Sequence, residues 1–218
     1  KLVLPREDQF GVDLDHVSLD VRAGEVVGIA GVSGNGQKEL LYSLSGEDTR
    51  AQPAMIEILG KPAGRLHPRQ RRALGMHFVP EERLGRGAVP SLGLAHNLLL
   101  TRSESVGKGG WIRTGALEKQ AASIIERFKV KAGGPLSAAR SLSGGNLQKF
   151  IVGREIDARP KVFIVSQPTW GVDVGAAALI RGEILAMRDA GCAVLVVSEE
   201  LDELFEISDR LYVIAKGR

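Results

Sequence analysis

The sequence has little of what marks several common classes of protein. It contains one cysteine, Cys192, which rules out an intrachain disulfide framework and suits a reducing cytoplasm. No stretch approaches the roughly 18 consecutive apolar residues that a membrane-spanning helix needs, and we expect no secretory signal before the fold. Because Cys192 lies just before an apolar segment, we expect it to be buried rather than reactive.

Neither sign of charge dominates the composition. The 218 residues carry a net charge of +3, with 44% hydrophobic and 25% charged residues. Such a chain is ordinary for a globular protein and long enough for one large α/β domain. The densest basic cluster runs from Arg65 to Arg72. It could bind nucleic acid or acidic lipid, but a solvated helix face is the simpler interpretation, and no nucleic-acid partner is expected.

A lysine is missing from the segment that most suggests phosphate binding. The residues of this segment are Gly31, Val32, Ser33, Gly34, Asn35, Gly36, Gln37 and Lys38. They follow an apolar run, Val26–Gly31, that predicts a buried strand, and they precede a helical pattern. They match the P-loop template G-x-x-x-x-G-K-[ST] except at its end. Glycines suit such a loop because its amides must turn inward around phosphate oxygens, where a Cβ would block the approach.

The glutamine at position 37 removes a positive charge from this loop. A hydrogen bond to a charged group contributes about 1.5–3 kcal/mol. Lys38 cannot replace it, because one step along a helix turns a side chain by about 100°, and Lys38 itself displaces the hydroxyl that would hold magnesium. The loop could still bind a nucleotide through its amides and the helix N-terminus. A glycine-rich turn with no ligand is the alternative.

A second glycine-rich motif, Ser141–Lys149, opens a helical pattern that runs to about Ala158. Ser143 can cap this helix, while Gly144 and Gly145 let backbone amides meet an anion. A capping turn alone would explain Ser143 but not the whole motif. The sequence therefore predicts a second helix N-terminus that faces a phosphate.

Together the two motifs resemble those of the ATP-binding cassette ATPases. The residues Leu142, Ser143, Gly144, Gly145 and Asn146 are similar to the signature of that family, usually written LSGGQ. The P-loop, the signature and the apolar strand after it come in the family's order. Within the family, the chain resembles the second cassette of the tandem ATP-binding subunits of sugar and nucleoside importers. Four segments carry this resemblance, which covers nearly the whole chain: 78–83, 142–149, 167–173 and 197–202.

The resemblance implies an α/β fold, that of an ABC-type P-loop NTPase with a parallel core sheet, an antiparallel β subdomain and a helical subdomain. In a single ATP-binding domain, 1–218, it places the core in 1–81 and 141–218 and the helical subdomain in about 82–140. Strands around Met55–Leu59 and Gly75–Val79 fit the antiparallel part.

The C-terminal pattern supports this fold. Predicted strands alternate there with predicted helices, which favours a parallel sheet with right-handed crossovers. The strands are expected at 161–166, 193–198 and 210–215, and the helices near 175–190 and 200–208.

The family pattern also shows substitutions at catalytic positions. Ser166 and Gln167 stand where an aspartate would hold the magnesium shell and a glutamate would polarise the attacking water. Gln167 cannot act as a general base, a role that contributes about 10²–10⁴ in rate. The switch-histidine position carries Glu199, whose charge is unfavourable beside a γ-phosphate, and the Q-loop position carries Glu81. No metal ligand is certain, and neutral drift at any one site is the alternative to a specialised inactive site.

Two further positions are assigned from the family. Asp173 stands where the D-loop aspartate falls, so that element is kept. Phe10 is the aromatic residue placed to stack on adenine, or it belongs to the core.

The retained signature implies a role in a partner's active site. Family cassettes pair head to tail, so that the signature of one closes on the P-loop of the other. The signature residues would then contact the γ-phosphate of ATP held by a first cassette, where helix-terminal donors stabilise charge without a base of their own.

The resemblance thus implies a domain of an importer ATPase for a sugar or nucleoside, weak in hydrolysis itself, with ATP as ligand and Mg²⁺ weakly supported. Expected partners are a first cassette of the same polypeptide or a second copy, and transmembrane permease subunits at the cytoplasmic face of the plasma membrane. The alternatives are a nucleotide-sensing or dimerisation module, and a cassette ATPase acting on nucleic acid or ribosomes.

Three further expectations concern the remaining segments. The loop Ser103–Gly110 is rich in glycine and polar residues, which favours disorder. The region Glu81–Asn97 is where the family receives a coupling helix, and its charged residues either gate that contact or solvate a loop. The chain stops where relatives usually add another strand, so we expect an excised C-terminal half with any first cassette upstream.

Overall fold

The computed structural model describes residues 1–102, 107–108 and 111–218. These residues form two compact units. The first contains Lys1–Phe78, Lys161–Ile164 and Arg188–Arg218, and the second contains Val79–Pro160 and Val165–Met187. This division does not test the predicted boundaries of core and helical subdomain, which stay a prediction.

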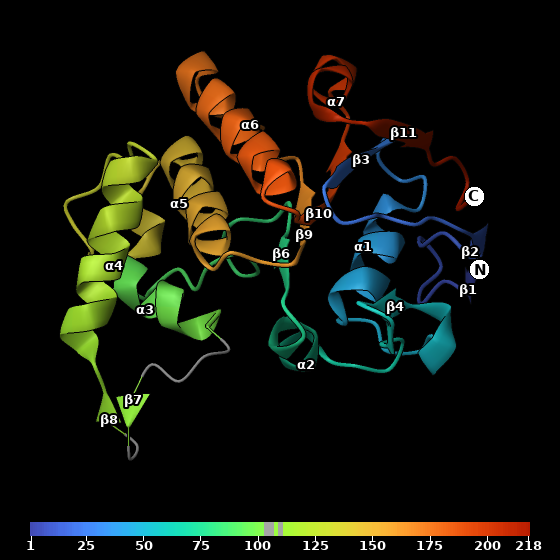
Figure 1. The fold of residues 1–218 in the computed structure, drawn as a ribbon, viewed down its shortest axis with the longest axis horizontal. Helices are drawn as coiled ribbons and strands as arrows, with labels where there is room; N and C mark the ends of the chain where they lie inside the picture. Colours follow the sequence, from blue (N-terminus) through green and yellow to red (C-terminus); the bar gives the residue numbers. More distant parts are fainter. Residues whose placement is uncertain (103–106, 109–110) are drawn as a thin grey trace. The chain divides into compact units, whose positions relative to one another are not determined.

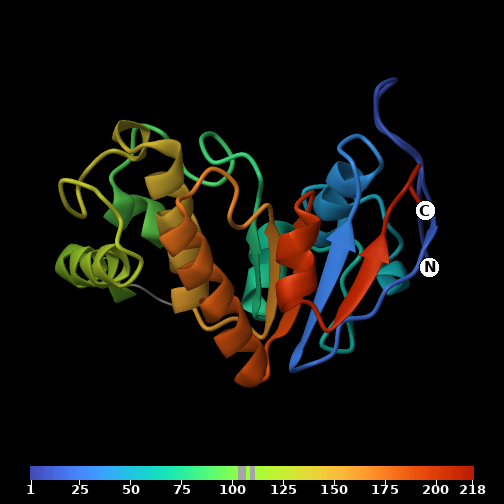
Figure 2. The ribbon, with the colours of Figure 1, turned by 90° about the horizontal axis from the view of Figure 1, so that it is seen from above.

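Most of a five-stranded sheet belongs to the first unit. In order across the sheet its strands are β11 (Arg210–Val213), β3 (Glu25–Ala30), β10 (Ala193–Ser198), β9 (Val162–Ser166) and β6 (Met76–Val79). β3 pairs in parallel with both β10 and β11, as the blue and red arrows of Figure 2 show. β10 is buried at every residue and β3 at all but one. Burial on both faces explains why these strands are unbroken apolar runs in the sequence.

The strand at Gly75–Val79 was wrongly predicted for the antiparallel part. β6 instead lies at the edge of the five-stranded sheet, next to β9. All four of its residues are buried, which suits a strand of the central layer. The antiparallel pairs of this unit are β1 (Leu2–Leu4) with β2 (Leu14–Val17), and β4 (Glu57–Ile58) with β5 (Lys61–Pro62).

The helices of the first unit are α1 (Gln37–Ser45), α2 (Pro68–Ala73) and α7 (Leu201–Ile207), with a short 3-10 helix at Pro53–Met55 (Figure 1). Leu40 and Leu41 of α1 belong to one buried cluster with Ile29 of β3 and Leu195 of β10. The apolar face of α1 thus fixes this helix on the sheet and sets the direction of the loop that precedes it.

Arg71 is the exception to the interpretation of the basic cluster as a solvated face. Its side chain is fully buried, and burial lowers the pKa of its guanidinium to about 10. The guanidinium donates to four backbone oxygens at 2.6–3.2 Å, those of Ser43, Leu44, Gly64 and Leu66. Two of these oxygens lie in the last turn of α1, where carbonyls lack partners within the helix. Arg71 therefore completes the end of α1, while Arg69 is exposed.

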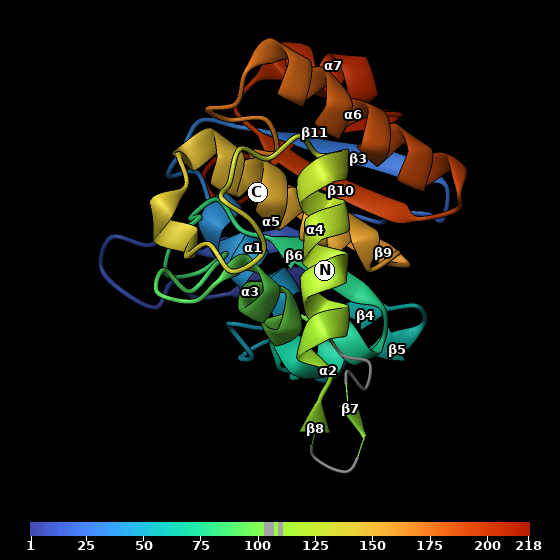
Figure 3. The ribbon, with the colours of Figure 1, turned by 90° about the vertical axis from the view of Figure 1, so that its left-hand side faces the viewer.

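Helices form most of the second unit. They are α3 (Leu94–Leu100), α4 (Thr114–Arg127), α5 (Gly144–Asp157) and α6 (Val174–Asp189), with a 3-10 helix at Ala139–Ser141 and a ribbon of β7 (Gly107–Lys108) and β8 (Trp111–Ile112). α4 contacts both α3 and α5 and lies nearest the viewer in Figure 3. The loop predicted as disordered, 103–110, falls mostly outside the described residues.

Buried polar side chains fix the segment between β6 and α3 against α5. Arg154 of α5 donates to the backbone oxygen of Gly87 at 2.9 Å. Asn97, which is fully buried in α3, accepts from the amide of Val89 at 2.7 Å. These bonds hold in place the loop on which the charged residues 81–86 lie.

None of the described helices has the length and apolar character that crossing a membrane demands. The parallel core sheet, the antiparallel strands and the helical part agree with the predicted fold class.

Candidate functional site

The predicted P-loop joins β3 to α1 through two glycines in left-handed conformation. Gly34 and Gly36 have φ of +84° and +107°, a region that residues with a Cβ rarely adopt. Gly36 is the N-cap of α1, and its oxygen accepts from the amide of Leu40 at 2.9 Å. The eight residues 31–38 thus form one strand–loop–helix turn whose amides gather at the helix N-terminus, which is the backbone arrangement that phosphate binding requires.

The side chain of Gln37 folds back into this loop. Its Nε2 donates to the oxygen of Val32 at 2.9 Å, and its Oε1 accepts from the amide of Asn35 at 3.0 Å. A Cβ on Gly31 would lie 2.6 Å from the same Nε2 and 2.7 Å from the backbone oxygen of Ile214, so a residue larger than glycine would crowd this side of the loop. The carboxamide is neutral, and the loop gains no positive charge from it.

Lys38 does not supply the missing charge. Its Nζ lies over the ring of Tyr42, one turn further along α1, at 5.4 Å from the ring centre. The lysine therefore follows the helix surface, and its side chain is exposed. This agrees with the expectation that one step along the helix turns a side chain out of the loop.

Glu199 comes close to the P-loop through the register of the sheet. Ser198, the last residue of β10, pairs with Ala30, the last residue of β3. Glu199 directly follows β10, and Gly31 directly follows β3. The ends of the two parallel strands therefore bring these residues to the same edge of the sheet. Glu199 is exposed, and Ser198 fixes the turn behind it by accepting from the amide of Glu200 at 3.1 Å.

Ser166 and Gln167 lie together in the second unit at the end of β9. Ser166 is buried, with 2% of its surface exposed. Gln167 has φ of +48°, and its backbone oxygen accepts from Nε2 of Gln148 at 3.2 Å. The positions predicted for metal binding and water activation therefore offer a buried hydroxyl and a neutral amide.

Magnesium does not fit this set of side chains. Mg²⁺ prefers carboxylate and phosphate oxygens in octahedral geometry, whereas the chain has Lys38, Ser166 and Gln167 at the corresponding positions. Within the residues that the structure describes, no group of three or more histidine, cysteine, aspartate or glutamate residues could hold a metal ion.

The predicted signature begins α5 in the expected way. Ser143 is the N-cap, and its Oγ accepts from the amide of Asn146 at 3.4 Å and from Nδ2 of Asn146 at 2.9 Å. Oδ1 of Asn146 accepts from the amide of Lys131 at 2.8 Å. Ser143 and Gly144 are exposed, while Leu142, Gly145 and Asn146 are partly buried. The start of this helix is fixed from two sides and still open to solvent.

Arg83 is a residue of this site that sequence reasoning missed. Its Nε donates to Oε1 of Gln148 at 3.1 Å, and its Nη2 donates to the backbone oxygen of Trp170. The guanidinium also lies over the Trp170 ring, 5.0 Å from its centre. Burial lowers the pKa of Arg83. Arg83 therefore does more than solvate a loop, while a gating role for this charged run stays a prediction.

Arg83 places a guanidinium against the start of the signature helix. A Cβ on Gly144 would lie 2.6 Å from its Nη1, so the two residues are in close contact. Gln148, which Arg83 contacts, donates in turn to the backbone oxygens of Gln167 and Pro168, each at 3.2 Å. We call the group formed by Arg83, Gln148 and the 167–170 loop the arginine clasp. It joins the signature helix to the loop that carries Gln167.

The remaining predicted residues take separate positions. Asp173 accepts from the amide of Ala176 at 2.9 Å, and this bond lowers the pKa of its carboxyl. Glu81 is exposed. Phe10 is 87% exposed, which rules out the core alternative. Whether Phe10 stacks on adenine stays a prediction, as do the roles of the other site residues.

Comparison with known proteins gives the family. The profile described as "ABC transporter" matches residues 14–170. The chain is 40% identical over 215 residues to the nucleoside import ATP-binding protein NupA of Lactococcus lactis subsp. cremoris, covering 98% of this chain and 42% of that protein. It is 41% identical over 215 residues to the guanosine import ATP-binding protein NupO of Bacillus subtilis, covering 97% of this chain and 42% of that protein. The chain thus spans less than half the length of these curated relatives.

The fold also matches solved cassettes. The dimeric structure of the ABC transporter cassette MJ0796 has a TM-score of 0.78 to this chain, with 20% identity, and the match covers 94% of this chain and 88% of that one. At this identity the likeness establishes the fold alone. The profile match covers most of the chain, and from it we conclude that the chain belongs to the ABC transporter family.

Proposed function

We propose that this chain is an ATP-binding cassette that works in an importer for a nucleoside or a sugar. Its relatives NupA and NupO are named as import ATP-binding proteins for nucleosides and guanosine, and a glucose import ATP-binding protein of Haloferax volcanii is 41% identical over 215 residues. Similarity over nearly the whole chain supports the same class of function. Between nucleoside and sugar, the transported molecule stays open.

The observation that carries the finer proposal is the difference between the two glycine-rich helix starts. At α1 the place of the phosphate-binding lysine holds a neutral Gln37 that bonds to its own loop. At α5 the capped signature start is exposed and has the Arg83 guanidinium beside it. The start of α1 thus lacks a cation, whereas the start of α5 has the Arg83 guanidinium close to where a phosphate would bind.

This cassette therefore binds ATP weakly at its own P-loop and hydrolyses it poorly. The amides of residues 31–38 hold the phosphates, and Phe10 is the residue available to adenine. Ser166 and Gln167 provide no carboxylate to hold magnesium or to take a proton from water, and general-base catalysis contributes about 10²–10⁴ in rate. Glu199 adds negative charge where a γ-phosphate would come.

The signature instead serves a partner's site. Ser143, Gly144 and the amides that follow present hydrogen-bond donors at the N-terminus of α5, where a phosphoryl group of ATP held by another cassette is stabilised. Asp173, at the start of α6, belongs to the same contact. The partner is a first cassette of the same polypeptide or a second copy of this chain, which makes this the second, degenerate cassette of a pair.

Permease subunits would carry the substrate across the membrane, with this domain at the cytoplasmic face.

The first test is ATP turnover by the purified chain. We expect turnover at or near background, and unchanged by Lys38→Ala. Turnover well above background that is abolished by changes in this chain's own P-loop would contradict a weak site.

The second test separates the two glycine-rich helix starts. In the assembled importer, Ser143→Arg should abolish substrate uptake, because an arginine side chain at the N-cap blocks the approach of a partner's phosphate. Ser123→Arg, on the exposed surface of α4 in the same unit, is the matched control and should leave uptake unchanged. Normal uptake by the Ser143 variant would overturn the role of the signature in a partner's site.

The alternatives make different predictions. A nucleotide-sensing or dimerisation module would bind nucleotide without any permease, and a cassette acting on nucleic acid would bind RNA or ribosomes through the basic cluster. Arg71 of that cluster is buried and unavailable to a nucleic acid, which weighs against the second alternative. Co-purification of the chain with a polytopic permease subunit, and not with RNA, would support the importer.

A further inference from the structure

The interior of the P-loop is already occupied by a side chain of this protein. The loop's backbone amides are the groups that cradle phosphate in this kind of site. In this chain the amide of Asn35 points at Oε1 of Gln37, at 3.0 Å, instead of at an open site. The other end of the carboxamide donates to the oxygen of Val32 at 2.9 Å. Gln37 thus spans the loop from one side to the other.

Asn35 uses all four of its polar groups without any ligand. Its amide donates to Gln37, and its side-chain Nδ2 donates to the oxygen of Val32 at 2.9 Å. Its backbone oxygen accepts from the amide of Gly217 at 2.9 Å, and its Oδ1 accepts from the amide of Lys216 at 3.0 Å. A loop whose hydrogen bonds are already made gains less from a phosphate, because each new bond replaces an existing one.

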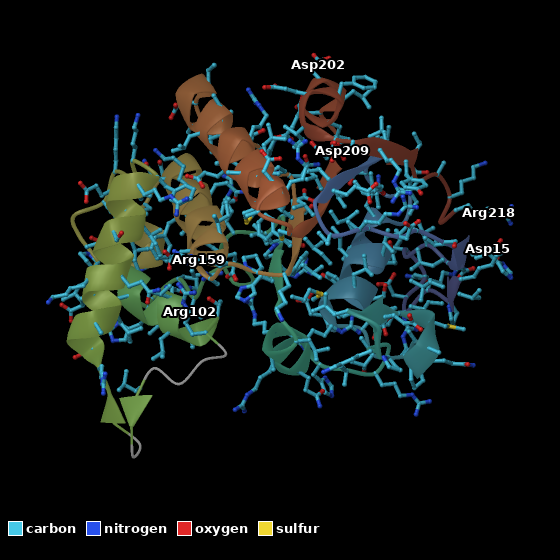
Figure 4. All side chains as sticks on the ribbon, viewed as in Figure 1. Asp15, Arg102, Arg159, Asp202, Asp209 and Arg218 are labelled. Atoms are coloured by element: carbon cyan, nitrogen blue, oxygen red, sulfur yellow. The ribbon has the colours of Figure 1, made fainter. Side chains whose placement is uncertain are left out.

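The segment behind the loop keeps it in this form. Gly217 packs so closely that a Cβ on Gly36 would lie 3.0 Å from its Cα. The oxygen of Gly217 accepts from the amide of Asp15 at 2.9 Å. Arg218 and Asp15, which lie side by side in Figure 4, form an ion pair at 2.7 Å. Asn35 is therefore held from outside the loop while its amide is held from inside.

We propose that Gln37 is an internal competitor for phosphate: its carboxamide occupies the cradle, and a nucleotide binds only when this side chain turns out. The proposal rests on the proposed function in one respect, that the P-loop binds ATP at all. It adds that Gln37 lowers the affinity by more than the absence of a positive charge, because it blocks a phosphate-binding amide.

A competitor and a ligand give opposite results on truncation. If the Gln37 amide contacted phosphate, removing it would weaken binding. If the carboxamide competes with phosphate, removing it frees the amide of Asn35 and strengthens binding. The geometry favours the second outcome, because both polar ends of the side chain are bonded within the loop.

The test is the affinity of the purified chain for ATP and for pyrophosphate, by calorimetry, in three variants. Gln37→Ala removes the carboxamide, and Gln37→Leu keeps a side chain of similar size without polar atoms. Gln52→Leu, at an exposed glutamine of the same unit, is the control. We expect both changes at position 37 to lower Kd for both ligands by about 3- to 10-fold, the factor that one neutral hydrogen bond contributes. An unchanged or higher Kd in both variants would overturn the proposal.

A second readout needs no ligand. The amide of Asn35 should exchange slowly with solvent in the unmodified chain and faster in both variants at position 37, as seen by NMR. Equal protection in all three would mean that Gln37 does not hold this amide, and the proposal fails. Rapid ATP turnover by the unmodified chain would count against the proposed function only, since the affinity ratio and the exchange rates do not depend on hydrolysis.

Discussion

Gly144 of the signature motif has two structural roles, and one of them involves Arg83. Gly144 belongs to the exposed start of α5, and it also leaves the space that the Arg83 guanidinium fills. From the sequence, a glycine at this place is explained by the approach of a phosphate. The structure adds a second reason within the chain itself, the arginine clasp.

We expect Gly144→Ala to displace Arg83, since a Cβ there would lie 2.6 Å from Nη1. Loss of the bonds to Gln148 and Trp170 should lower the free energy of unfolding by about 1.5–3 kcal/mol, the contribution of a hydrogen bond to a charged group. Urea unfolding measures this change. Gly182→Ala, on the exposed face of α6 where a Cβ meets nothing within 4 Å, is the control and should instead stabilise the chain by about 0.5–1 kcal/mol. Equal effects of the two changes would contradict the clasp.

Cys192 gives a prediction in pH. It is 5% exposed, and burial raises the pKa of its thiol from 9.0 to about 11. The folded state therefore keeps its proton where the unfolded state loses it. The stability that Cys192 contributes is fully present below pH 9 and is lost between pH 9 and 11, a change of about 2–3 kcal/mol.

The measurement is the free energy of unfolding in urea, at several pH values, of the unmodified chain and of the Cys192→Ala variant. All other groups titrate alike in the two proteins, so the difference between them isolates the contribution of the thiol. A constant difference from pH 8 to 11 would contradict a buried thiol. Slow alkylation of the folded chain at pH 8, and fast alkylation in urea, would support it.

At this scale the sequence predicted less than at any other. Arg71 and Arg83 were interpreted as solvated or gating charges, because charged residues in a polar run are usually exposed. Their partners are backbone oxygens and a glutamine far away in the sequence, and nothing in the pattern around an arginine tells which carbonyls will face it. Ser143 was predicted correctly as a cap because its partner, Asn146, is three residues away.

At the scale of elements, α1 is completed at each end by a residue that the motif does not include. Its first turn is tied to the N-terminal segment by Glu39, whose Oε1 accepts from the amide of Val12 at 3.1 Å. Its last turn is closed by Arg71 of α2. The helix that follows the P-loop is therefore held in place at both ends, as a helix that sets the position of phosphate-facing amides must be.

We expect Arg71→Met to destabilise the first unit by about 3 kcal/mol, because it leaves buried carbonyls at the end of α1 without donors. Arg69→Met, at an exposed position of the same helix, should change stability by less than about 0.5 kcal/mol. Thermal or urea unfolding distinguishes the two. A loss that is the same for both variants would mean that burial of Arg71 contributes nothing specific.

The elements themselves were largely predictable. β3, β10, α5 and α6 lie within a few residues of their predicted positions, because long apolar runs and capped helical patterns are strong local signals. β6 was misplaced, since a short buried strand looks the same in the sequence whichever sheet it joins. The pairing of a strand depends on contacts between segments that are distant in the sequence, and a local pattern does not predict those contacts.

At the scale of the whole molecule, the order of motifs predicted the family and the substitutions suggested the role. The comparisons confirm the family, with a profile match over most of the chain and relatives that match over nearly all of it. The consequence of the substitutions concerns magnesium. Lys38, Ser166 and Gln167 offer no carboxylate to hold magnesium, so under the proposed function the loop's amides hold the phosphates without help from the metal.

We therefore expect ATP to raise the melting temperature of the chain by the same small amount with magnesium and with EDTA. In cassettes that hold Mg²⁺ through protein oxygens, binding depends on the metal and so does the stabilisation, which follows ligand concentration over Kd. Differential scanning fluorimetry over a range of ATP concentrations measures both conditions. A shift present only with magnesium would show that this chain does hold the metal.

The turn at Lys216 and Gly217 offers a way to watch the P-loop directly. Lys216 is exposed, its amide bonds to Asn35, and the chain's one cysteine is buried. A Lys216→Cys change would thus create a single reactive thiol near the P-loop. Residue 216 is connected to Gln37 by two hydrogen bonds, both of which pass through Asn35. A fluorophore attached there would report each opening of the loop as a change in its own signal, and so give the rate at which the glutamine leaves.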